Sequence, residues 1–190
     1  YDITVTGRDN TLQHPYQTSW GLSTRMIGGI IMGHGDDRGL VLPPRVAPVQ
    51  VIVVPIVRSN DPEGSSAVET AVESLVAEAA AGTVRLRVDR REGVRPGEKF
   101  AHWELRGVPL RVVVGAKDLA EGNVTVVRRV DGLQVVTPLH GLGSRLPALL
   151  TEAQDLLLER SRSALSERSH DVVDLAGLIA AFADPGHPVF

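Results

Sequence analysis

The sequence predicts an α/β fold with a mixed, mostly parallel sheet that is flanked by helices. Apolar runs of strand length alternate along most of the chain with segments whose apolar residues recur at helical spacing, which is typical of strands joined by helices. The dipeptide Asp131-Gly132 stands between two strand-like runs and is a strong signal for a β-hairpin. Because a hairpin adds an antiparallel pair, the predicted sheet is mixed.

The first part of the chain is expected to form a strand, a loop, a second strand and a helix. Residues 1–6 alternate between apolar and polar side chains, residues 7–15 are typical of turns, and residues 16–20 form the second strand. Apolar residues then recur at helical spacing: Leu22, Met26, Ile27, Ile30 and Ile31. The prolines of residues 43–48 predict a stiff linker, and we place a domain boundary there, after a first region of residues 1–42.

An α/β domain is expected to follow the linker. Residues 49–57 form a strand that is buried on both faces, because the run is almost continuously apolar and rich in β-branched residues. A helix over residues 63–81, a strand over 83–88, a short helix over 96–105 and a strand over 109–114 come next.

The last part of the chain contributes the hairpin and further helices. The hairpin strands cover residues 124–130 and 133–137, which completes a domain of residues 49–143. Residues 144–190 are expected to be helical, as a long helix to about residue 168 and a short one over 172–182, and to complete or follow that domain.

Composition and charge limit the possible functions. The chain has no cysteine, which excludes disulfides and thiolate zinc sites and suits a reducing compartment. Its six histidines are not at metal-ligand spacing, so we expect no metal site, and no apolar run is long enough for a membrane span. The net charge is −3, yet residues 83–117 carry nine Lys or Arg against four Asp or Glu. This basic segment is either a surface for a polyanion or a solvated arginine-rich edge.

Residues 17–25, with the sequence QTSWGLSTR, are the most informative stretch. Arg25 stands in the first turn of the predicted helix, where a guanidinium and the helix N-terminus together suit a phosphate group. A plainer interpretation is that Arg25 pairs with Asp36 or Asp37. The whole run, with the continuation HGDDRGLVLPP at residues 34–44, resembles motif 3 of class II aminoacyl-tRNA synthetases in the form found in prolyl-tRNA synthetases of the archaeal and eukaryotic type.

The resemblance implies a role for each residue of this stretch. Arg25 would be the catalytic residue that contacts the phosphates of ATP, and residues 1–42 would be the last part of a class II catalytic core with an antiparallel sheet. The other residues implied to bind ATP or prolyl-adenylate lead up to it: Gln17, Thr18, Ser19, Trp20, Gly21, Ser23 and Thr24. His34, Asp36 and Asp37 also match the family, and we interpret them as helix-terminus and turn residues rather than metal ligands.

The segment from Pro96 to Asp118 combines an aromatic residue, a carboxylate and several cations, which is how proteins read unpaired bases. It resembles the anticodon-binding domain of the same synthetases. The resemblance implies that Phe100 stacks on a base, while Glu104, Arg111 and Lys117 read the two guanines of the proline anticodon. A role for Phe100 in the core is the alternative.

Two residues in that segment depart from the family pattern. Val113 stands where an acid is usual, and Ala116 stands where a proline is usual, which puts the shape of the Lys117 loop in doubt. Trp103 is interpreted as a core residue on the inner face of the short helix.

The resemblance implies a proline–tRNA ligase, which uses ATP with Mg²⁺ to form prolyl-adenylate and transfers proline to tRNA(Pro). We expect a cytoplasmic homodimer that forms through a catalytic domain outside these residues. Because motifs 1 and 2 of the family and its zinc-type domain are not among these 190 residues, we expect this chain alone to be inactive. Three alternatives stay open: a class II synthetase for threonine, histidine or glycine, a non-catalytic RNA-binding module, and a structural interaction domain.

Overall fold

The computed structural model describes residues 2–58, 60–80, 82–169 and 171–182. The chain divides into two compact units, of which the first ends at Gly33 and the second begins at His34.

The first unit contains a short hairpin and one helix. Strands β1 (Val5–Thr6) and β2 (Leu12–Gln13) pair antiparallel, and helix α1 (Arg25–Gly33) begins where the apolar spacing predicts it. The strand predicted over residues 16–20 is wrong: that segment has no regular structure. A strand needs a partner for its backbone groups, and the strand that pairs with β1 lies earlier, at β2.

The second unit begins with a hairpin that leads into a buried turn. Strands β3 (Gly35–Asp36) and β4 (Gly39–Leu40) pair antiparallel. Residues 43–48, predicted as a linker, form turns in which Ala47 is completely buried. The Arg85 guanidinium donates hydrogen bonds to the backbone carbonyls of Pro44, Arg45 and Ala47 at 2.9–3.1 Å. These bonds hold the proline-rich segment against the rest of the second unit. The second unit therefore starts before the predicted boundary, at His34.

A five-stranded mixed sheet forms the centre of the second unit, as predicted. Its strands are β5 (Val51–Ile56), β6 (Leu86–Val88), β7 (Leu110–Gly115), β8 (Asn123–Arg128) and β9 (Gln134–Pro138), in the order β6-β5-β7-β8-β9. Strand β5 is parallel to both β6 and β7, whereas β8 is antiparallel to β7 and to β9. The predicted hairpin at β8–β9 is confirmed, with Gly132 in the left-handed region at φ 71°.

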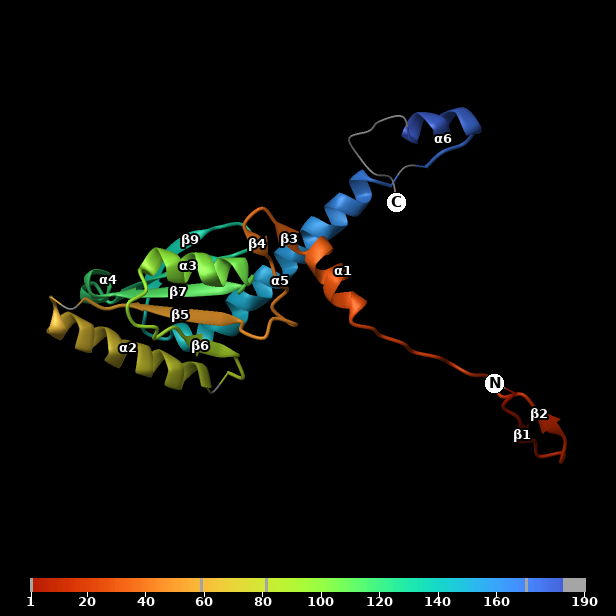
Figure 1. Ribbon diagram of the computed structural model, residues 1–190, viewed down its shortest axis with the longest axis horizontal. Coiled ribbons are helices and arrows are strands. Elements are labelled where there is room, and N and C mark those ends of the chain that lie inside the picture. The colour runs from red at the N-terminus through yellow and green to blue at the C-terminus, as the bar shows by residue number, and fades with distance from the viewer. Residues whose placement is uncertain (1, 59, 81, 170, 183–190) are drawn as a thin grey trace. The chain divides into compact units, whose positions relative to one another are not determined.

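Helices cover the two faces of this sheet unequally (Figure 1). Helices α2 (Pro62–Ala80) and α5 (Leu142–Glu167) pack on one face, where the main core lies between them and strands β5, β7 and β8. Helix α3 (Pro96–Leu105) packs on the other face over Ile52 and Val54 of β5. Helix α4 (Ala116–Ala120), which the sequence analysis did not predict, follows β7, and α6 (Leu175–Phe182) ends the described chain.

The face on which α3 packs stays partly open beyond β5. The strand register places Ile52, Arg111, Val127 and Gln134 side by side across β5, β7, β8 and β9. Ile52 is completely buried, whereas Arg111 and Val127 are half-buried and Gln134 is exposed. The sheet therefore presents an open, polar surface next to helix α3.

Candidate nucleic-acid interface

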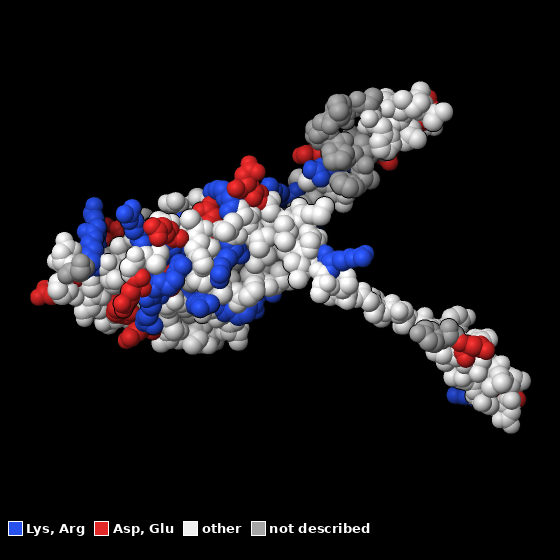
Figure 2. All heavy atoms as spheres, in the orientation of Figure 1, with Lys and Arg blue, Asp and Glu red and all other residues white. Residues whose placement is uncertain are grey.

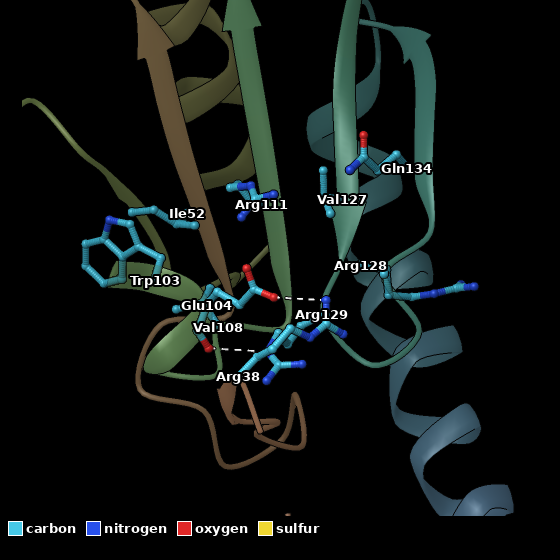
Figure 3. Close-up of a pocket in the computed structure, with 11 residues that line it drawn as sticks. Arg38, Ile52, Trp103, Glu104, Val108, Arg111, Val127, Arg128, Arg129 and Gln134 are labelled. Atoms are coloured by element: carbon cyan, nitrogen blue, oxygen red, sulfur yellow. Dashed lines mark hydrogen bonds and ion pairs between the residues drawn. The ribbon is translucent and has the colours of Figure 1, made fainter. Parts of the chain in front are cut away.

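A pocket of about 120 Å³ lies on this open face, between the end of α3, strands β7 and β8, and the β8–β9 connection. We call it the α3 pocket (Figure 3). Apolar side chains form one wall, among them Ile52, Trp103 and Val108. The charged and polar residues that line it are Arg38, Glu104, Arg111, Arg128, Arg129 and Gln134. Two of the four predicted anticodon residues, Glu104 and Arg111, thus share one pocket.

Glu104 is the only carboxylate among the residues that line the α3 pocket. It lies in the last turn of α3, and its carboxylate accepts an ion-pair contact from Arg38 Nη1 at 3.1 Å. Its side chain is 27% exposed. The backbone carbonyl of Glu104 also accepts a hydrogen bond from Arg129 Nε at 3.2 Å. The Arg38 contact orients the carboxylate, and the Arg129 contact holds the backbone of the same residue.

Arg111 faces Glu104 from strand β7, and Figure 3 shows the two side chains extending toward the same space. The Arg111 guanidinium lies over the Phe100 ring at 4.4 Å from the ring centroid. Its Nε is buried without a hydrogen-bond partner among the described residues. Burial lowers the pKa of Arg111, although a guanidinium stays charged in proteins. A buried donor without a partner is costly, which marks this atom as one that a ligand would satisfy.

The position of Phe100 agrees with the alternative prediction, a role in the core. The ring is half-buried and packs against the cluster of Ile52, Val54, Trp103 and Val108. Its face also supports the Arg111 guanidinium. In this structure Phe100 is therefore a core residue that positions a cation, and stacking of a base on its ring stays a prediction.

A buried carboxylate anchors helix α3 to the sheet. Asp89, directly after β6, is 3% exposed and accepts a hydrogen bond from Trp103 Nε1 at 2.7 Å. The Arg91 guanidinium donates two hydrogen bonds to the same carboxylate, at 2.9 and 2.6 Å, and the Arg91 backbone N–H donates a third at 3.2 Å. The bonds from Arg91, and then the one from Trp103, hold the pKa of Asp89 well below its usual range. Trp103 is 6% exposed, which confirms its predicted place in the core.

A second ion pair attaches the β3–β4 hairpin to the pocket. Arg129, which is 5% exposed at its side chain, donates to both carboxylate oxygens of Asp36 at 2.8 and 2.6 Å. These bonds hold the pKa of Asp36 well below its usual range. The interpretation of Asp36 as a simple turn residue was incomplete, because its carboxylate is the partner of a buried arginine. Sequence reasoning did not find Arg38 or Arg129, since both depend on contacts between distant segments.

Lys117 lies apart from the other three predicted anticodon residues. It is exposed on α4 and lines a second pocket of about 470 Å³ at the carboxyl ends of β5 and β7, with Arg58, Asp61 and Ser65. Arg111 and Gly115 stand on the same face of β7, about 13 Å apart along an extended strand. The two pockets are therefore neighbours along one strand.

The predicted nucleotide residues are exposed in the first unit. Trp20 is 93% exposed, and Gln17, Thr18, Ser19 and Gly21 are exposed in a segment without regular structure. At the start of α1, the Arg25 N–H donates to Ser23 Oγ at 3.3 Å. The N–H groups of the next two residues donate to the carbonyls of Ser23 and Thr24. These backbone donors are occupied within the turn, so the side chain of Arg25 is the group that stays available for an anion.

The described residues contain neither a metal-binding group of side chains nor a helix suited to span a membrane. Within them no three His, Asp or Glu side chains gather as a metal-binding group. In the same part of the chain, no helix has both the length and the apolar character that a membrane span requires.

Residues 50–149 match the family described as the anticodon binding domain, and the chain belongs to that family. The relatives that it resembles are proline–tRNA ligases. The chain is 48% identical over 176 residues to the "Proline--tRNA ligase" of Roseiflexus sp. (strain RS-1), and this match covers 90% of the chain and 36% of the relative. It is 40% identical over 186 residues to the "Proline--tRNA ligase" of Cenarchaeum symbiosum (strain A), a match that covers 98% of the chain and 39% of the relative.

A solved structure is similar over nearly the same length. The prolyl-tRNA synthetase from Cryptosporidium parvum, complexed with L-proline and AMP, matches with a TM-score of 0.81 and 37% sequence identity. The match covers 94% of the chain and 38% of that structure. The chain thus spans little more than a third of the length of these relatives, and the resemblance inferred from its sequence is confirmed.

Proposed function

We propose that this chain is part of a proline–tRNA ligase and that its second unit reads the anticodon of tRNA(Pro). The observation that carries the proposal is the placement of Glu104 and Arg111 in one pocket. The Watson–Crick edge of guanine offers N1–H and N2–H₂ as donors, which suit a carboxylate, and guanine O6 and N7 are acceptors that suit a guanidinium. Lys117 in the neighbouring pocket is a cation for the second guanine or its phosphate.

The first unit would contribute to the activation of proline. In the full-length enzyme, ATP with Mg²⁺ and proline react to prolyl-adenylate, and proline is then transferred to the 3′ end of the tRNA. Arg25 stabilises the charge on the ATP phosphates, while residues 17–21, Ser23 and Thr24 line the site of the nucleotide and the adenylate. The exposure of Trp20, Leu22, Met26 and Ile27 supports this role, because such an apolar surface is typical of one that other parts of a protein cover.

The same proposal includes the oligomeric state and the cellular location of the full-length enzyme. The full-length enzyme is expected to be a cytoplasmic homodimer that forms through its catalytic domain. This chain alone is expected to be inactive, because it spans little more than a third of the length of its relatives.

A non-catalytic RNA-binding module is the second candidate. It is favoured by the fact that the α3 pocket, its anchors and its sheet all belong to the second unit. The two candidates differ in whether the full-length protein activates proline.

Proline-dependent exchange of pyrophosphate into ATP by the full-length protein distinguishes them. We expect exchange in the wild type and a loss of at least about 100-fold in Arg25→Ala, the size typical of removing a group that stabilises transition-state charge. Arg8→Ala is the matched control, since Arg8 is an exposed arginine of the same unit. Absence of exchange in the wild type would favour the RNA-binding module, and normal exchange in Arg25→Ala would remove Arg25 from the site.

A further inference from the structure

Two arginines lie near the indole ring of Trp103 in helix α3. Arg87 comes from β6 and Arg106 is the C-cap residue of α3. The guanidinium carbon of each lies 5.6 Å from the centroid of the Trp103 ring. Both arginines are exposed. Since a guanidinium is attracted to an aromatic face, one ring holds both cations in place.

Neither arginine is neutralised by a neighbour. Among the described residues, Arg87 and Arg106 form no ion pair and their side chains donate no hydrogen bond, whereas nearby Arg90 pairs with Glu69 at 3.1 Å. The carbonyls of Trp103 and Glu104 at the end of α3 already accept hydrogen bonds from the N–H groups of Val108 and Gly107. These two carbonyls therefore do not need a hydrogen bond from the Arg106 side chain.

The electrostatic surroundings of His102 agree with an excess of positive charge here. Burial lowers the pKa of His102, and the charges of Arg106, Arg91 and Arg87 lower it further, whereas the charge of Asp89 raises it. Figure 2 shows Lys and Arg side chains in the region of α3, with Asp and Glu side chains among them. Two exposed cations that form no ion pair among the described residues, and that lie near one ring, are suited to an anion.

We propose that Arg87 and Arg106 form a binding site for a backbone phosphate of RNA, next to the α3 pocket. The inference rests on the proposed function, because an RNA whose bases enter the pocket must lay its backbone across the adjoining surface. Trp103 connects the two sites: its ring supports both arginines, and the same residue lines the α3 pocket. Guanidinium groups bind phosphate through paired hydrogen bonds, and such contacts position RNA without reading its sequence.

The test measures how the affinity of the full-length protein for an RNA hairpin with the proline anticodon loop depends on salt concentration. We expect Arg87→Gln and Arg106→Gln each to reduce the slope of log K against log salt by about 0.7–0.9, the value for one phosphate contact. Arg87→Lys and Arg106→Lys keep the charge and should keep the slope. Arg90→Gln is the matched control, because Arg90 lies nearby and is paired with Glu69.

Each outcome decides the proposal. Slopes that fall in the two glutamine variants but not in Arg90→Gln support the phosphate site. Wild-type slopes in both glutamine variants, with guanine preference retained, would overturn it and leave the arginines as covers for Trp103. Equal losses in the lysine and glutamine variants would also overturn it, because charge would then not be the cause. A wild type that binds the hairpin without preference for guanine would contradict the proposed function itself, and with it the phosphate site.

Discussion

At the scale of single residues, the α3 pocket depends on the contact between the Phe100 ring and the Arg111 guanidinium. Phe100 is half-buried in a small apolar cluster, and its face holds the guanidinium of Arg111 at 4.4 Å. The sequence identified both residue types but could not show that one supports the other. The ring and the cation come from α3 and β7, and only the packing of α3 on the sheet brings them together.

We expect Phe100→Leu to weaken binding of the anticodon hairpin while the apolar packing is largely kept. The binding free energy should become less favourable by about 0.5–2 kcal/mol, the size of a cation–π contact, because the Arg111 guanidinium is no longer held in place. Phe100→Tyr keeps the ring and is the matched control. Equilibrium titration of the full-length protein with the hairpin measures the change, and a leucine variant that binds like the wild type would show that the ring does not position Arg111.

At the scale of elements, helix α3 is positioned by a polar anchor inside an apolar interface. The Asp89 carboxylate accepts a hydrogen bond from the Trp103 indole N–H and two from the Arg91 guanidinium. The backbone carbonyl of Asp89 accepts a hydrogen bond from Lys99 Nζ at 3.2 Å. Phe100 and Glu104 stand on the same helix as Trp103 and Lys99. The anchor therefore orients the residues of the pocket although Asp89 does not line it.

We expect Asp89→Asn to lower the free energy of unfolding by about 1–3 kcal/mol at pH 7, the cost of leaving buried polar partners poorly satisfied. The pKa of Asp89 is depressed in the folded state, so its ionised form stabilises the fold above the unfolded pKa of about 3.9. That stabilisation is lost as the pH falls further, and the difference between wild type and variant should shrink below about pH 4. Urea unfolding at pH 7 and pH 3 measures it, with Asp37→Asn as an exposed control. A difference that does not change with pH would rule out an anchor based on charge.

At the scale of the whole molecule, local patterns in the sequence predicted most of the second unit. The apolar run of β5, the stripe of α2 and the Asp131-Gly132 hairpin are features of short segments, and the structure contains each. Contacts between distant segments were not predictable in this way. The pair of Asp36 and Arg129 and the row from Ile52 to Gln134 exist only because of the sheet order and register.

Two segments, one in each unit, do not follow the local pattern of their sequence. The segment over residues 16–20 is predicted to be a strand, yet without a partner among the described residues it has no regular structure. The proline-rich segment over residues 43–48 reads as a linker, yet Arg85 binds its carbonyls and buries Ala47. In both cases tertiary contacts, rather than local preference, decide the outcome.

The most direct measurement is a cycle that pairs Glu104→Ala with replacement of each anticodon guanine by inosine, which lacks the N2 amino group. If the Glu104 carboxylate accepts from that amino group, inosine should weaken hairpin binding by the wild-type full-length protein by about 1–3 kcal/mol at one position and have little effect on Glu104→Ala. Glu98→Ala, on the same helix but not among the residues that line the α3 pocket, should keep the wild-type penalty. An equal inosine penalty in the wild type and in Glu104→Ala, at both positions, would show that Glu104 does not read guanine.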